Sequence, residues 1–273
     1  MIEINVVSII LVTLAGWIAG IIVNALSDDL PERRSPKLPH YADGSPRPIL
    51  AWSGILAFIF NQRAAPDGSR LRWRYPLTEL CTIGLFLLTL ITFQDDAEIT
   101  LLQFIIYLLY IAIFVLITVI DLEHRLILFV VIIPSCLLAL ADAIFIDYGP
   151  DVGEALLGAL LGFGIFFLLY LGGFIFTALL SSLRGSKIEE VAFGYGDVML
   201  ITLSGLILGW QALIITMFLT VFLGALGAVI YLIVRRLAGR HYSLFTPLPY
   251  GQYIVIATVA MLLFAPEIAA FFR

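Results

Sequence analysis

Long apolar runs alternate with short polar segments along most of the chain, a pattern typical of membrane-spanning helices. Such a helix needs roughly 20 consecutive, mostly apolar residues. The sixth run is short, and joining it to the seventh would give a segment too long for one crossing of the membrane. Gly209 and Trp210 therefore predict a tight reversal between these two runs. The expected spans are about residues 4–26, 76–93, 100–120, 126–146, 153–180, 198–209, 211–234 and 251–272.

The composition narrows the class of protein. Apolar residues make up 62% of the 273 residues and charged residues 13%, whereas soluble domains average about 45–50% and about 25%. This excludes a soluble globule, a disordered chain and a nucleic-acid-binding protein. The fold class expected is an all-α integral membrane protein, with the lipid bilayer as a partner and no nucleic acid. The N-terminal run has no basic n-region or cleavage site, so it is predicted to be a retained helix.

The positions of the basic residues predict the topology. With eight spans, 14 of the 15 Lys and Arg residues lie on one side of the membrane, and only Arg273 lies opposite. Seven spans would move the cluster at residues 235–240 to the wrong side. The positive-inside rule therefore favours eight helices in the cytoplasmic (inner) membrane, with both termini extracytoplasmic and one long cytoplasmic loop after the first helix.

That loop, residues 27–75, is rich in Pro, Arg and Asp. Its apolar stretch at residues 49–60 is too short to span. Two interpretations stay open: the stretch lies in the membrane interface with Trp52 and Phe58 at headgroup depth, or it is a packed loop segment. The chain is divided here into residues 1–93, an N-terminal region with two helices and this loop, and residues 94–273, a six-helix region.

Carboxylates near membrane spans cost about 2.5–3.5 kcal/mol at the bilayer centre, which makes them candidates for function. Four stand out: Glu79, Asp121, Asp142 and Asp197. Asp142 is expected to be structural or interfacial. Asp121 ends the third predicted helix and Asp197 opens the sixth. Since the chain crosses the membrane twice between them, both are predicted at the cytoplasmic boundary.

Two carboxylates that face each other share one proton, because like charges about 3 Å apart cannot both ionise. The ionised partner takes a proton from water, and the protonated partner hydrogen-bonds a scissile carbonyl and protonates the leaving amine. This is the logic of aspartic proteases, and it needs no metal or bound cofactor. Gly194 and Gly196, just before Asp197, allow positive φ or a close approach of a substrate.

The sequence around both aspartates resembles the type IV prepilin peptidase family. Asp121-Leu-Glu-His-Arg-Leu-Ile, with Pro134 downstream, is similar to the first aspartate motif, and Phe193-Gly-Tyr-Gly-Asp197-Val-Met-Leu to the second. Three further stretches match in order: residues 20–24 followed by Leu30-Pro31, residues 72–80 with Arg74-Tyr-Pro-Leu-Thr-Glu79, and Pro247-Leu-Pro-Tyr-Gly251.

The resemblance implies a membrane aspartic endopeptidase. It would cleave the basic leader of type IV prepilin or pseudopilin precursors on the cytoplasmic side, just before the hydrophobic helix of the substrate. Asp121 and Asp197 would form the catalytic pair, and eight helices is the architecture of the family. Glu123, Glu189 and Glu190 could attract the basic leader, although solvated surface charge is the simpler interpretation of the last two.

Departures from the family pattern concern cofactors. Many members carry two CxxC pairs that bind zinc in the first loop, but residues 27–75 contain no cysteine, so a zinc site is not expected. Bifunctional members also methylate the new N-terminus with S-adenosylmethionine. This cofactor is implied for the present chain only if the methylation activity is retained. The residues assigned to a substrate or methyl-donor region are Asn24, Arg74, Glu79 and Glu123. For Glu79, a local ion pair with Arg72 and Arg74 is the alternative.

Three other functions are alternatives to the prepilin peptidase. A presenilin-like intramembrane protease shares the Gly-x-Gly-Asp element, but it predicts Tyr before the first aspartate, where this chain has Ile120, and a Pro-Ala-Leu motif that the chain lacks. A proton-coupled transporter with paired carboxylates would place ionisable groups near the middle of the membrane, and inverted repeats are typical of such proteins. A degenerate homologue with only an assembly role would not need both aspartates.

Overall fold

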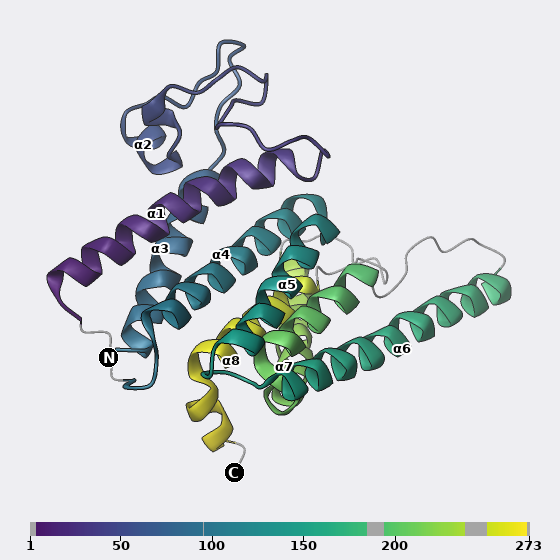
Figure 1. Cartoon of the computed structure of the whole chain (residues 1–273). Coiled ribbons are helices and arrows are strands. Elements are labelled where there is room, and N and C mark those ends of the chain that lie inside the picture. Colours follow the sequence, from purple (N-terminus) through teal and green to yellow (C-terminus); the bar gives the residue numbers. More distant parts are fainter. Residues whose placement is uncertain (1–3, 95, 185–193, 238–249, 272–273) are drawn as a thin grey trace. The chain divides into compact units, whose positions relative to one another are not determined.

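The computed structural model describes residues 4–94, 96–184, 194–237 and 250–271, and within these ranges it is helical with no β-strand (Figure 1). The chain forms two compact units, Met1–Leu128 and Phe129–Arg273, which are described separately. The helices are α1 (Val6–Asp29), η1 (Ile49–Ala51, a 3-10 turn), α2 (Gly54–Ile59), α3 (Arg74–Thr92), α4 (Leu101–His124), α5 (Phe129–Phe145), α6 (Val152–Arg184), α7 (Tyr195–Leu237) and α8 (Gly251–Phe271).

Six of the described helices are long and apolar enough to cross a membrane. They are Val6–Asp29, Arg74–Thr92, Leu101–His124, Val152–Ile175, Tyr195–Arg236 and Gly251–Ile268. Large apolar side chains on their outer faces are exposed, such as Val7, Leu11 and Ile18 of α1, as expected where the solvent is lipid. The protein is therefore a multi-pass, all-α membrane protein, as the composition predicts. Eight spans stay a prediction, because α5 has only 17 residues and the whole of α7 is a single helix in the count of six.

In the N-terminal unit, α1 and α3 pack closely in antiparallel directions. A Cβ on Gly20 would lie 2.7 Å from the Cα of Glu79, and one on Gly16 would lie 2.9 Å from the Cα of Ile83. Glycines at these two positions let the backbones approach, as is common between membrane helices. This close packing also brings residues near the C-terminal end of α1 against the first turns of α3.

In the C-terminal unit, α7 folds back on itself at Gly209, whose backbone is not helical (φ 74°, ψ 169°). Ser204 hydrogen-bonds Thr258 of α8 at 2.8 Å, and a Cβ on Gly227 would meet the ring of Tyr253. In one straight helix Ser204 and Gly227 would be about 34 Å apart, whereas their partners on α8 are only about 7–8 Å apart. The reversal predicted at residues 209–210 is thus confirmed.

The compact units end at a different residue from the division proposed from the sequence. α4 packs with α1 and α3 in the N-terminal unit, so this unit continues to Leu128. The division at residue 93 separates regions by expected function and stays a prediction.

Candidate functional site

Asp121 lies in the last turn of α4, which ends where Arg125 adopts the left-handed conformation (φ 55°) and donates its N–H to the Asp121 carbonyl at 2.9 Å. Asp121 is only 7% exposed. Its Oδ2 has no hydrogen-bond partner among the described residues. A buried polar atom without a protein partner is costly unless water or another molecule satisfies it, so this oxygen is available to such a molecule.

Asp197 lies in the first turn of α7, in the C-terminal unit, and is half-buried. The Gly194 N–H donates to its Oδ2 at 3.2 Å, and the Asp197 N–H donates to the Gly194 carbonyl at 3.1 Å. The Gly194-Tyr195-Gly196 turn therefore folds around the carboxylate, as short Asp side chains favour. A Cβ on Gly194 would lie 3.4 Å from Oδ2, so the turn approaches the carboxylate closely.

Aromatic side chains from neighbouring helices surround this turn. The Tyr195 ring lies 5.9 Å from that of Phe129 on α5 and 5.8 Å from that of Tyr170 on α6. Burial and the negative charge of Asp197 raise the pKa of Tyr250, the residue before α8. The sequence indicated Tyr250 only as part of a proline-containing turn, and its place beside Asp197 is a finding of the structure. Other members of the predicted motifs and loop, Phe193, Glu189, Glu190 and residues 247–249, lie outside the described residues.

Glu79, in the second turn of α3, is fully buried and accepts five hydrogen bonds. The donors are the Ser53 hydroxyl (2.6 Å), the backbone N–H groups of Gly54 (2.5 Å) and Ile55 (3.1 Å), the Trp17 indole (3.2 Å) and the Asn24 amide (3.4 Å). The carboxylate thus fastens the start of α2 to α1 and α3. The alternative of a local ion pair is wrong, because Arg72 and Arg74 pair elsewhere.

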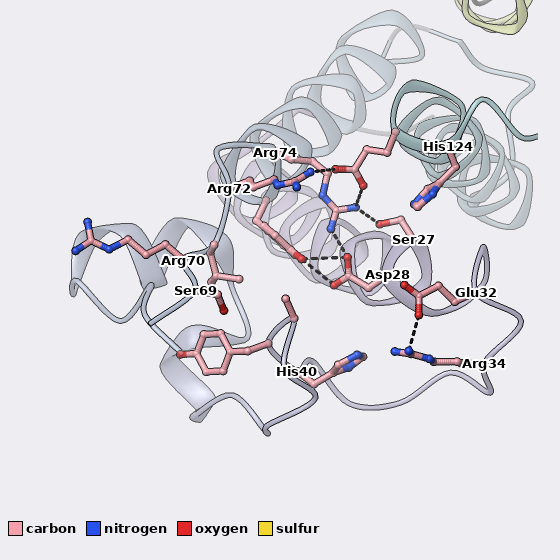
Figure 2. A pocket seen from close by; sticks show the side chains of 15 residues that line it. Ser27, Asp28, Glu32, Arg34, His40, Ser69, Arg70, Arg72, Arg74 and His124 are labelled. Carbon is pink, nitrogen blue, oxygen red and sulfur yellow. Dashed lines mark hydrogen bonds and ion pairs between the residues drawn. The ribbon is translucent and has the colours of Figure 1, made fainter. Parts of the chain in front are cut away.

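Arg74 joins α1, α3 and α4 at the wall of a pocket of about 260 Å³ in the N-terminal unit (Figure 2). Its guanidinium donates to the Ser27 hydroxyl at 2.7 Å and to Glu123 Oε2 at 2.9 Å, and it also pairs with Asp28. The Tyr75 hydroxyl donates to Asp28 at 3.0 Å. Figure 2 shows the side chains of Ser27 and Asp28 lying beside the Arg74 guanidinium.

The structure thus brings together Asn24, Arg74, Glu79 and Glu123 around the ends of α1 and α3, as the sequence predicts for one region. Asn24 links the two parts, since its amide also donates to the Tyr75 carbonyl at 3.0 Å. Sequence reasoning missed Asp28, whose only signal was its place four residues after Asn24. Among the described residues, no group of three or more His, Cys, Asp or Glu side chains could hold a metal ion.

The fold and these side chains define a class: a helical multi-pass membrane protein with an aspartate at one end of a helix in each of its two units. Comparison with known proteins then shows which family this chain is similar to. Residues 108–229, which include Asp121 and Asp197, match the type IV leader peptidase family. This region of the chain is thus similar to that family, as the resemblance seen in the sequence predicts.

Curated relatives extend the match beyond that region. The chain is 28% identical over 225 residues to a prepilin leader peptidase/N-methyltransferase of Aeromonas salmonicida (strain A449), covering 82% of this chain and 68% of the relative. A protein of the same name from Pseudomonas putida is 28% identical over 228 residues, with 81% and 70% covered. The one from Pseudomonas aeruginosa is 30% identical over 151 residues, with 55% and 46% covered. No solved structure matches the chain.

Proposed function

We propose that the chain is a membrane aspartic endopeptidase that removes the basic leader of type IV prepilin or pseudopilin precursors at the cytoplasmic boundary of the inner membrane. The observation that carries the proposal is the buried Asp121 carboxylate, whose Oδ2 has no partner among the described residues. It lies in the region that matches the leader peptidase family. The names of the curated relatives give the substrate class.

In this proposal, Asp121 and Asp197 are the catalytic pair, which requires that both carboxylates reach one water in the working enzyme. The ionised carboxylate takes a proton from the water as its oxygen attacks the scissile carbonyl carbon. The protonated carboxylate hydrogen-bonds the carbonyl oxygen and then gives its proton to the leaving amine as the C–N bond breaks. Gly194 and Gly196 support the backbone around Asp197. The cleavage itself needs no metal or bound cofactor.

Replacing either aspartate tests the proposal. General acid–base groups contribute about 10²–10⁴-fold to a rate, so Asp121→Asn and Asp197→Asn should each lower leader cleavage by at least about 100-fold. The assay uses the full-length protein in vesicles with a prepilin precursor, and the new N-terminus is sequenced. Asp142→Asn is the matched control, because it replaces a membrane aspartate to which no role in cleavage is given. Cleavage retained by both Asn variants would overturn the assignment.

We propose a second activity, N-methylation of the new N-terminus, which the relatives' names include. What favours it here is the pocket beside Arg74, where Asp28 and Glu123 place carboxylates near a half-buried guanidinium. The carboxylates and the guanidinium have charges opposite to those of the ammonium and carboxylate in the amino acid part of S-adenosylmethionine, which would supply the methyl group. A methyl-sized increment in the mass of the cleaved product, dependent on S-adenosylmethionine, supports this activity, and an unchanged mass contradicts it.

A further inference from the structure

The loop between α1 and α3 exposes large apolar side chains that water would not favour. Ile49, Ile59, Phe60 and Trp73 are 78%, 68%, 56% and 68% exposed, respectively, and we call these four residues the loop patch. Clusters of exposed large apolar residues indicate contact with a partner or a membrane.

Trp52 and Phe58, which one of the two interpretations placed at headgroup depth, are turned toward the loop itself. The Trp52 indole donates to the Arg47 carbonyl at 3.1 Å, and Phe58 packs on a buried cluster beneath the loop. That cluster consists of Tyr41, Ala51, Ala57, Ala65 and Leu71. The loop therefore has its own small core, and the loop patch is its outer surface.

The start of α2 is satisfied entirely by protein groups. Its first N–H groups, those of Gly54 and Ile55, donate to Glu79, and the next, that of Leu56, donates to the Ser53 hydroxyl at 3.2 Å. Glu79 lies five residues into α3, about 7–8 Å along the helix from Arg74. At that depth beside a spanning helix water is scarce, so unpaired N–H groups would be costly. The buried Glu79 carboxylate removes this cost for α2.

The loop patch also continues the exposed apolar face of α3. Trp73, Leu77 and Leu80 follow each other at helical spacing, and Leu77 and Leu80 are 59% and 55% exposed. The rings of Trp73 and Phe58 are 4.6 Å apart, which joins the loop to this face. Between Phe60 and Trp73 the chain carries three arginines (residues 63, 70 and 72) and one acidic residue, Asp67. This charge is complementary to anionic lipid headgroups.

We propose that residues 49–60, together with Trp73, lie in the boundary between headgroups and acyl chains of the leaflet at which α3 begins, and that the loop patch binds an anionic bilayer. Glu79 is the positioning residue that holds this segment beside α3. The proposal does not depend on peptidase activity. Of the two interpretations that the sequence leaves open for residues 49–60, the proposal favours the membrane interface. The side chains that contact the membrane in this proposal are those of the loop patch, not Trp52 and Phe58.

Spin labels on the full-length protein in vesicles test this proposal. In a Cys81→Ala, Cys136→Ala background, a nitroxide is attached at Ile59→Cys or Phe60→Cys and compared with Asp43→Cys and Asp67→Cys, exposed polar positions of the same loop. Oxygen dissolves in the bilayer and a nickel chelate stays in water. In vesicles containing phosphatidylglycerol, we expect labels at 59 and 60 to collide preferentially with oxygen, and labels at 43 and 67 with the chelate.

Other outcomes would overturn the proposal. Preference for the chelate at 59 and 60 would mean that the patch faces water, and low access to both reagents would mean that protein, such as a second copy of the chain, covers it. The same oxygen preference in pure phosphatidylcholine vesicles would overturn the role of anionic lipid. Glu79→Gln in the Ile59→Cys background should make the label more mobile and reduce its oxygen preference. An unchanged spectrum would overturn the role of Glu79.

Discussion

Arg74 shows how a single side chain can join three helices. Its two terminal nitrogens contact α1 through Ser27 and Asp28 and α4 through Glu123. Its guanidinium also lies 4.2 Å from the centre of the Tyr75 ring. A planar fork with several donors can make these contacts at once, whereas the ammonium of lysine is a compact point charge on a flexible stem.

Arg74→Lys should therefore lower stability although it keeps the charge. Losing one or two hydrogen bonds to charged partners costs about 1.5–3 kcal/mol each, so we expect a clearly lower midpoint of thermal unfolding in detergent. Arg70→Lys is the control, because Arg70 is an exposed arginine of the same loop and its replacement should leave the midpoint nearly unchanged. Equal midpoints for the two variants would contradict the joining role of Arg74.

For single residues, the sequence predicts which side chains belong to the site, but it does not predict which groups they contact. Asn24, Arg74 and Glu79 were identified through the family resemblance, and the structure places them together. The partners could not be read from spacing, because Arg74 and Asp28 are 46 residues apart and meet only through the antiparallel packing of α1 and α3. A pair between Glu79 and its neighbouring arginines was one of two interpretations of the local charge, but in the structure this carboxylate accepts hydrogen bonds from the N–H groups of α2.

Among the elements, the reversal inside α7 depends on one residue. Gly209 has φ 74° and ψ 169°, a backbone conformation that is essentially restricted to glycine. A Cβ at this position would also lie 2.9 Å from the Cβ of Pro150, in the connection before α6. Both the backbone and the neighbouring proline therefore exclude a larger residue here.

Gly209→Ala should cost about 1–3 kcal/mol of stability, the usual cost of a strained backbone conformation. Gly164→Ala is the matched control, because Gly164 lies within α6 with open space around its Cβ position, and alanine favours helix there. Thermal unfolding in detergent should show a lower midpoint for Gly209→Ala and an unchanged or higher one for Gly164→Ala. A neutral Gly209→Ala would mean that the reversal does not need this conformation.

Hydrophobic periodicity predicted the long helices and this reversal, because both follow from apolar length and a breaking residue. It did not predict how residues 49–60 would fold. Their helix has only six residues, and its position depends on Glu79, a carboxylate 24 or more residues further along the chain. Short segments held by distant side chains leave no periodic signal of their own.

For the whole molecule, the few charged residues predict the orientation in the membrane. Basic residues concentrate in the loop at residues 27–75, whereas the connections at residues 94–100 and 146–152 carry only acidic charge. Lys and Arg are retained on the cytoplasmic side of a membrane far more often than acidic residues are. This asymmetry extends over the whole chain and does not depend on packing, so the sequence alone reveals it.

We therefore expect the loop at residues 27–75 to be cytoplasmic and the acidic connections to be outside. In the Cys81→Ala, Cys136→Ala background, a maleimide that cannot cross the membrane should label Glu98→Cys and Gly149→Cys in intact cells. It should label Asp43→Cys only after the inner membrane is made permeable. These positions are exposed, at the surface of connections or loops, so their replacement should not disturb packing. Labelling of Asp43→Cys in intact cells would mean that the loop lies outside and that the orientation is the reverse of the one expected. The loop would then be on the side opposite the basic leader of a precursor, which would contradict cleavage at the cytoplasmic boundary.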